Sequence, residues 1–130
     1  MKVLLDCDVL LDVALARAPH LGHSADVLRW AEAGGTAAVA WHTLTNCAYL
    51  LKGSGRSFLT TLLRFISVAP AGTVVAHRAL RLPMRDLEDA FLSAAALSWG
   101  AEFIITRNIN DYRRSPVPAI TPTAFMSRLP

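Results

Sequence analysis

Three aspartates, Asp6, Asp8 and Asp12, closely follow the apolar run 3–5 at the start of the chain. Such a run is typical of a buried strand, and ligands of open α/β sheets bind at the carboxyl ends of the strands. A buried carboxylate is unfavourable unless a partner compensates for its charge. Asp8 alone has a second explanation, as the N-cap of a helix that begins at Val9. Capping leaves Asp6 unexplained, and we therefore predict that Asp6 belongs to a polar site.

A second set of polar residues follows a later apolar run. Thr106, Asn108 and Asp111 come after residues 103–105, Phe-Ile-Ile. Crossovers between parallel strands are right-handed, so the carboxyl ends of the strands share one edge of the sheet. We expect these residues to lie at the same edge as Asp6.

Two predicted helices contribute to this edge. One follows the apolar run 36–40 and carries Asn46, and the other begins with Asp86 and Asp89, which lie on one helix face. The spacing Asp-x-x-Asp at a helix start also fits a cap, so Asp86 is better explained as an N-cap than as a ligand.

Carboxylates that converge without lysines repel one another. A hard divalent cation removes this repulsion, because Mg²⁺ or Mn²⁺ takes oxygen ligands and is shared with substrate phosphates. Such a cation lowers the pKa of a bound water and neutralises charge on a phosphodiester during in-line attack. The predicted chemistry is metal-dependent phosphodiester hydrolysis.

Other common chemistries lack their motifs. The sequence contains no GxGxxG after the first strand, no GxxxxGK[ST] and no GxSxG. Its four histidines show no HExxH spacing, and its two cysteines, Cys7 and Cys47, form no CxxC motif. Dinucleotide binding, P-loop chemistry, a serine nucleophile and a zinc site are all disfavoured.

The bulk composition indicates one domain, residues 1–130, with a real core, because 53% of the residues are hydrophobic. Two cysteines in apolar surroundings predict core packing in a reduced, cytoplasmic protein. No apolar run approaches the length of a membrane span, and no secretory signal is evident. The net charge of +3 is compatible with a polyanionic partner.

Predicted strands and helices alternate along the chain. The strands are expected at 3–5, 36–40, 67–69, 103–105 and 117–120; the helices are expected at 9–16, 24–34, 43–52, 57–65, 73–82 and 86–100, with a last one capped by Thr121 or Thr123 and with Ser24 and Thr43 as further N-caps. This alternation predicts an α/β fold with a mostly parallel sheet of four to five strands and helices on both faces.

Two stretches of the chain resemble the PIN-domain nucleases, the fold of VapC-like toxins of toxin–antitoxin pairs. Residues 4–12, LLDCDVLLD, resemble the family's DTNVLLD start. Residues 86–112 resemble its block of an acidic helix start, a Gly turn, a buried strand and the ending TrN..DF. The resemblance covers nearly the whole chain. It implies a small α/β/α domain that hydrolyses RNA with Mg²⁺ or Mn²⁺ held by a few acidic residues.

The resemblance assigns roles to individual residues. It makes Asp6 the first acid, Asp89 the helix acid and Asp111 the acid after the last strand of the block, all three as metal ligands. Thr106 and Asn108 would orient water or phosphate nearby.

Further residues are expected to assist. Asp8 stands where the family usually has a small polar residue and is an additional candidate ligand. Arg107, Arg113 and Arg114 flank the site and are expected to contact RNA phosphates. The expected partners are RNA, a small antitoxin that blocks the cleft, and a second copy of the chain in a homodimer.

One position departs from the family pattern. The family commonly has a glutamate where this chain has Asn46, which offers a carbonyl oxygen but no charge. Asp8 would restore that charge from a different direction. The departure leaves open an alternative function, a catalytically weakened PIN module that binds RNA or a protein partner.

A third hypothesis comes from the first motif alone. The sequence Asp6-Cys7-Asp8-Val9 also fits the DxDx[VT] start of haloacid-dehalogenase-type phosphatases, with Asp6 as nucleophile and Asp8 as general acid. That family needs a lysine between its second motif and its final acids. Lys2 and Lys52 are the only lysines, and neither has that place.

Overall fold

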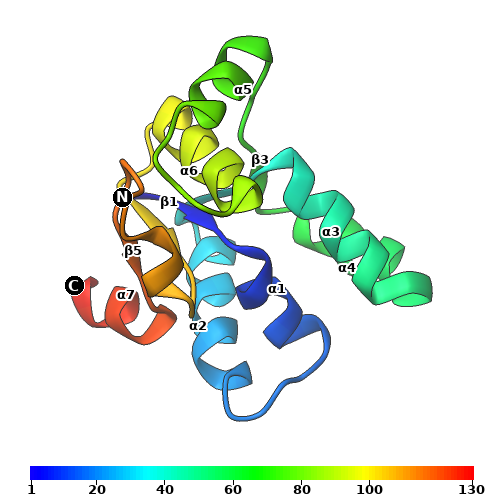
Figure 1. Ribbon diagram of the computed structural model, residues 1–130. Helices are drawn as coiled ribbons and strands as arrows, with labels where there is room; N and C mark the ends of the chain where they lie inside the picture. Colours follow the sequence, from blue (N-terminus) through cyan, green and yellow to red (C-terminus); the bar gives the residue numbers. More distant parts are fainter.

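The computed structural model describes all residues from 1 to 130 and shows strands and helices in alternation (Figure 1). The strands are β1 (Lys2–Leu5), β2 (Thr36–Val39), β3 (Ser67–Val68), β4 (Phe103–Ile105) and β5 (Ala119–Ile120). The helices are α1 (Cys7–Ala14), α2 (Leu21–Glu32), α3 (Trp41–Leu51), α4 (Gly55–Leu62), α5 (Thr73–Leu80), α6 (Leu87–Trp99) and α7 (Pro122–Arg128), with 3-10 turns η1 (Lys52–Ser54) and η2 (Ile109–Tyr112).

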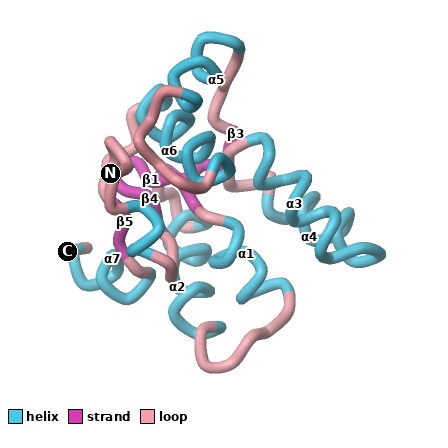
Figure 2. The backbone as a smooth tube through the Cα atoms, viewed as in Figure 1, coloured by secondary structure: helices cyan, strands magenta, loops and turns pink.

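The five strands form one parallel sheet in the order β3-β2-β1-β4-β5, which confirms the predicted α/β fold. Figure 2 shows the short strands with helices around them. Strand β1 is central, and Leu5 pairs with Ile105 of β4. The strand order reverses at β1, because β2 lies on one side of it and β4 on the other. In open α/β sheets, this reversal is the place where ligands bind.

Both faces of the sheet are buried, which explains why β1 is a continuous apolar run. Val3 and Leu5 point to one face, where they pack with residues of α1, α2, α3, α4 and α7. Leu4 points to the other face, where Leu92 of α6 and its neighbours cover it. Helix α5 packs on α6, and the α3–α4 pair extends from one side of the sheet (Figure 1).

The first helix begins earlier than predicted, and a different aspartate caps it. Asp6, in extended conformation, is the N-cap of α1 and accepts a hydrogen bond of 2.7 Å from the backbone N–H of Cys7. The alternative explanation of Asp8 as the cap is therefore wrong, and so is the premise that capping leaves Asp6 unexplained. Asp8 lies in the first helical turn, and its carboxylate is free to bind another part of the chain.

Two other predicted caps are also wrong. Ser24 lies inside α2, which begins at Leu21, and Thr43 lies inside α3, which begins at Trp41. Both hydroxyl residues are buried, so tertiary packing determines their place more than capping does. Asp86 and Thr121 do cap α6 and α7, as predicted.

Helix α6 ends at Trp99 and is followed by Gly100, which has a φ of +88°. This left-handed conformation favours glycine, and it turns the chain directly into β4. Cys7 and Cys47 are free, buried core residues, as predicted. No helix combines the length and the apolar character that crossing a membrane requires.

Candidate active site

Asp6 and Thr106 meet because their strands are neighbours in register. Asp6 follows Leu5 at the end of β1, and Thr106 follows Ile105 at the end of β4. The backbone N–H of Asp6 bonds to the carbonyl of Ile105 at 3.0 Å and extends the ladder by one residue. The hydroxyl of Thr106, which is fully buried, lies 2.9 Å from Oδ2 of Asp6. The sheet itself therefore fixes the first acidic residue of the site.

Asp8 binds the loop that follows β4. Its Oδ2 accepts a hydrogen bond of 2.9 Å from the backbone N–H of Arg107 and one of 3.3 Å from Nδ2 of Asn108. The same oxygen lies 3.2 Å from the hydroxyl of Thr106. Its other oxygen, Oδ1, is buried without a hydrogen-bond partner. Burial and then the charge of Asp6 raise the pKa of Asp8 from 3.8 to about 6.

Tyr112 joins two acidic residues from distant parts of the sequence. Its hydroxyl lies 3.1 Å from Oδ2 of Asp6 and 3.1 Å from Oδ1 of Asp89. A phenol has one proton to donate, so one of the two carboxylates remains without it. Burial raises the pKa of Asp6, although the hydrogen bonds from Thr106, Cys7 and Tyr112 oppose this rise.

Asp89 lies in the first turn of α6, behind the capping residue. The backbone N–H of Asp89 donates to Oδ1 of Asp86 at 3.1 Å, which confirms Asp86 as the cap and leaves the Asp89 carboxylate free to face the sheet edge. Burial, and to a lesser extent the charges of Asp86, Asp6 and Asp111, raise the pKa of Asp89 from 3.8 to about 6. These acidic residues therefore carry unfavourable negative charge at neutral pH.

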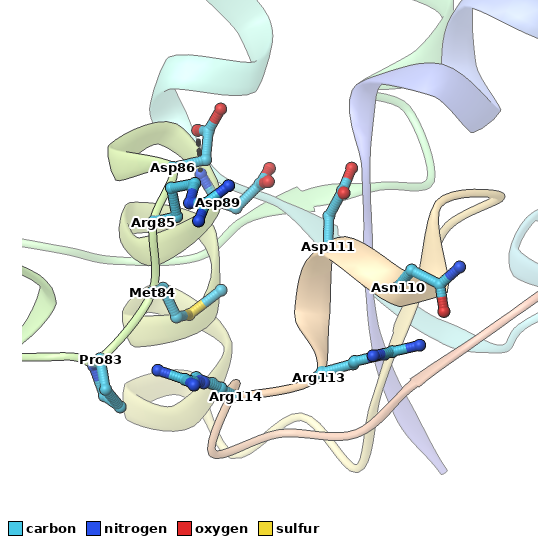
Figure 3. Close-up of a pocket in the computed structure, with 9 residues that line it drawn as sticks. All are labelled: Pro83, Met84, Arg85, Asp86, Asp89, Asn110, Asp111, Arg113 and Arg114. Carbon is cyan, nitrogen blue, oxygen red and sulfur yellow. Dashed lines mark hydrogen bonds between the residues drawn. The ribbon is translucent and has the colours of Figure 1, made fainter.

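Two contiguous clefts open at this edge. One, of about 410 Å³, is lined by Asp6, Asp8, Asn46, Asp89 and Asp111 among others. The second, of about 640 Å³, shares Asp89 and Asp111 with the first. Figure 3 shows this second cleft with Asp86, Asp89 and Asp111 at one end, where Arg85 also lies, and with Arg113 and Arg114 at the other. The structure thus brings all five predicted ligands to one connected surface.

The three predicted phosphate-binding arginines differ in their surroundings. Arg113 and Arg114 are exposed, line the larger cleft and form no ion pair. The guanidinium of Arg107 instead donates two hydrogen bonds, of 2.8 and 3.1 Å, to the carboxylate of Asp12. Its charge is committed to this pair, so Arg113 and Arg114 are the better candidates for phosphate contacts.

The side chains fit a hard divalent cation by their chemistry. Every candidate donor is an oxygen, and Oδ1 of Asp8 is a buried oxygen that lacks a partner. Asp6 and Asp89 both lie within hydrogen-bond distance of the one hydroxyl of Tyr112. No three carboxylate, histidine or cysteine side chains are grouped as a ready metal site. Asp111 is exposed and makes no side-chain hydrogen bond, so its carboxylate can turn into the cleft.

Sequence reasoning missed two residues of the site and one buried pair that holds Arg107 of the adjoining loop. The hydroxyl of Tyr112 was one, although the sequence carries its signal: tyrosine stands where the family pattern TrN..DF has phenylalanine. The buried pair of Asp12 and Ser24 was another, at 2.9 Å, and it had no local sequence signal. Glu88 also lines the smaller cleft, next to Asp89 in the sequence.

The fold and the site define a class of protein: a small parallel α/β domain with an acidic cleft where its strand order reverses. The sequence profile of the PIN domain matches residues 2–110, and the chain therefore belongs to the PIN-domain family, whose members are generally nucleases. This membership argues against the phosphatase hypothesis.

Solved structures agree with this fold. A chain of VapBC2 from Rickettsia felis, crystallised with a DNA fragment from its promoter, is similar with a TM-score of 0.74 and 16% identity, over 93% of this chain and 98% of that one. FitAcB from Neisseria gonorrhoeae is similar with a TM-score of 0.61 and 15% identity, over 94% and 99%. At these identities, the similarity shows the fold alone. No curated protein sequence matches the chain.

Proposed function

We propose that this protein is a metal-dependent ribonuclease, the toxin of a toxin–antitoxin pair. The observation that carries the proposal is the convergence of Asp6 and Asp89 on one tyrosine hydroxyl at the edge of the sheet. Two carboxylates with raised pKa values, in a cleft whose only basic lining residue is Arg17, are stabilised by a divalent cation.

Asp6, Asp89 and Asp111 would hold Mg²⁺ or Mn²⁺, with Asp8 and Asn46 beside them. The cation would stabilise charge on the phosphodiester and lower the pKa of a bound water. Thr106 and Tyr112 position the Asp6 carboxylate through hydrogen bonds. Asn108, whose amide nitrogen donates to Asp8, lines the cleft and would help to orient water or phosphate there.

The larger cleft is proposed to bind the RNA strand. Arg113 and Arg114 would contact phosphates next to the scissile one, because they lie at the end of the cleft opposite the carboxylates (Figure 3). Positive charge there offsets the repulsion between the acidic residues and a polyanion.

The antitoxin proposal is supported by the similar structures, VapBC2 and FitAcB. Helix α3 also exposes large apolar side chains: Trp41 is 68% exposed, Tyr49 80% and Leu50 52%. Tyr49 and Leu50 line the acidic cleft, so a protein bound on α3 would cover the cleft as well. A homodimer remains a prediction.

The first experiment is cleavage of labelled single-stranded RNA by wild type and by Asp6→Asn, with Mn²⁺, Mg²⁺ or EDTA. Asparagine is also a good N-cap, so the variant keeps the start of α1. We expect metal-dependent cleavage that the variant loses while it stays folded. Equal cleavage by both proteins would refute the assignment of Asp6.

The weakened PIN module remains the second candidate, because Asn46 lies in the cleft as a neutral residue. Under this alternative, folded wild type binds RNA or a protein partner but does not cleave RNA. Cleavage that appears only in Asn46→Glu would favour this candidate over the first.

A further inference from the structure

The acidic cleft contains a carboxylate that has no role in the site described so far. Glu88 lies in the first turn of α6 and lines the same cleft as Asp6, Asn46 and Asp89. Its side chain is exposed, and it forms neither an ion pair nor a side-chain hydrogen bond. An exposed carboxylate without a partner is available to bind a ligand.

The negative charge of Glu88 also acts on titratable groups around the cleft. Its charge contributes to the raised pKa of Asp6, at the end of the central strand. It likewise raises the pKa of His42 of α3, against the effect of burial. Glu88 shares the lining of the cleft with Asp6, which follows β1, and with Asn46 of α3.

A purely structural role explains Glu88 poorly. An acidic residue in the first turn of a helix interacts favourably with the helix dipole, by about 0.3–1 kcal/mol. Asp86 already caps α6, and Asp89 already adds a second negative charge to this turn. A third negative charge beside them adds repulsion to a helix start that needs no further partner.

The carboxylate that Glu88 can replace is the one missing from the facing helix, α3. Asn46 of α3 is a neutral residue in this cleft, at the position where the PIN resemblance implies a glutamate. Asn46 offers at most one neutral oxygen to a cation, so a site of Asp6, Asp89 and Asp111 lacks one negative charge there. Asp8 offers only one free oxygen, Oδ1, because its Oδ2 is already occupied by the loop after β4.

We infer that Glu88 supplies from α6 the carboxylate that Asn46 does not supply from α3, and that it helps Asp6 and Asp89 to hold the divalent cation. This inference rests on the proposed function. It assigns a metal-binding role to a residue outside the set that the family resemblance implies.

The test is a calorimetric titration of Mn²⁺ into the metal-free full chain, which measures binding without turnover. Glu88→Gln is expected to weaken Mn²⁺ binding about tenfold or more. Adding Asn46→Glu to that variant is expected to recover most of the loss, because the charge returns from the facing helix. The matched control is Glu102→Gln, which removes the same charge at an exposed position before β4.

The outcomes separate this inference from the proposed function. If Asp6→Asn abolishes Mn²⁺ binding and Glu88→Gln leaves it unchanged, the metal site stands and the role of Glu88 is overturned. Equal losses in Glu88→Gln and Glu102→Gln, or no recovery with Asn46→Glu, also overturn it. If wild type binds no Mn²⁺, both proposals fail. Thermal unfolding of each variant checks that the fold is intact.

Discussion

Arg107 and Asp12 form a bidentate ion pair that ties the loop after β4 to helix α1. The guanidinium donates hydrogen bonds of 2.8 and 3.1 Å to a carboxylate that is completely buried. The hydroxyl of Ser24 donates a further bond of 2.9 Å to the same carboxylate. The backbone N–H of Arg107 binds Asp8, so the pair also holds the loop that carries Thr106.

Replacing Arg107 with leucine should destabilise the protein strongly. The change leaves the Asp12 carboxylate buried with only Ser24 and a distant Arg17, 4.0 Å away. Removing one partner of a buried ion pair costs about 3–5 kcal/mol, and we expect a loss of that order in the free energy of unfolding, measured by urea denaturation. The control is Arg29→Leu, because Arg29 pairs with Asp26 on the surface and should cost less than about 1 kcal/mol. A similar small loss in both variants would contradict the structural role of the pair.

Tyr112→Phe removes only the hydroxyl that joins Asp6 and Asp89. The hydrogen bond from Tyr112 lowers the pKa of Asp89, so its loss should raise that pKa further above 6. We expect the rising limb of the pH–rate profile for RNA cleavage to move to higher pH, and the rate at pH 7 to fall more than the rate at pH 8.5. Tyr49→Phe is the matched control, since it removes the chain's other tyrosine hydroxyl from the same cleft, where that hydroxyl makes no such bond. An unshifted profile would show that the hydroxyl does not tune the site.

The raised pKa values also predict how stability depends on pH. Asp8 and Asp89 have folded-state pKa values of about 6 instead of 3.8, so the folded protein binds protons more tightly than the unfolded chain. Their stabilising contribution to the free energy of unfolding is fully present below about pH 4 and is lost as the pH rises through about 6. In EDTA, the free energy of unfolding should fall over this window, and Mn²⁺ should reduce the fall by stabilising the charged forms.

The variant Asp89→Asn isolates this effect from other titrating groups. It removes one of the raised carboxylates, so urea denaturation from pH 4 to pH 7 in EDTA should show a shallower decline than wild type. A decline of the same slope would mean that Asp89 is not destabilised by its surroundings.

The fold was predictable because its strands are short apolar runs between clear breaks. The run 103–105 and the Gly100 turn before it are local signals, and both were predicted correctly. The helix starts at Leu21 and Trp41 were missed, because neither has a side chain that caps it. Ser24 and Thr43 look like caps in the sequence, but their burial inside the helices depends on packing partners elsewhere in the chain.

The candidate site was predictable as far as the sheet edge defines it. Asp6 and Thr106 are paired by strand register, which the order of elements implies. The partners of Asp12, the position of Tyr112 between two acidic residues and the cleft position of Glu88 depend on side-chain geometry across distant segments. No local pattern encodes those contacts.

RNA binding at the basic end of the larger cleft can be measured under conditions in which RNA is not cleaved. Arg113 and Arg114 line the cleft opposite the carboxylates and have no acidic partner, so they are free to bind phosphates. Each phosphate contact with single-stranded RNA contributes about −0.7 to the slope of log K against log salt concentration. In EDTA, Arg113→Ala and Arg114→Ala should each weaken binding of a labelled single-stranded RNA. Each should also make this slope less negative by about the contribution of one phosphate contact.

Arg128→Ala is the matched control for these two variants. The guanidinium of Arg128 lies over the ring of Phe103, 5.0 Å from its centroid, on α7 and away from both clefts. All three variants lose one positive charge, so a general effect of net charge would change the salt dependence equally in each. A slope that changes only in Arg113→Ala and Arg114→Ala identifies phosphate contacts in the cleft. Equal changes in all three variants would contradict the proposal that the RNA strand binds in this cleft.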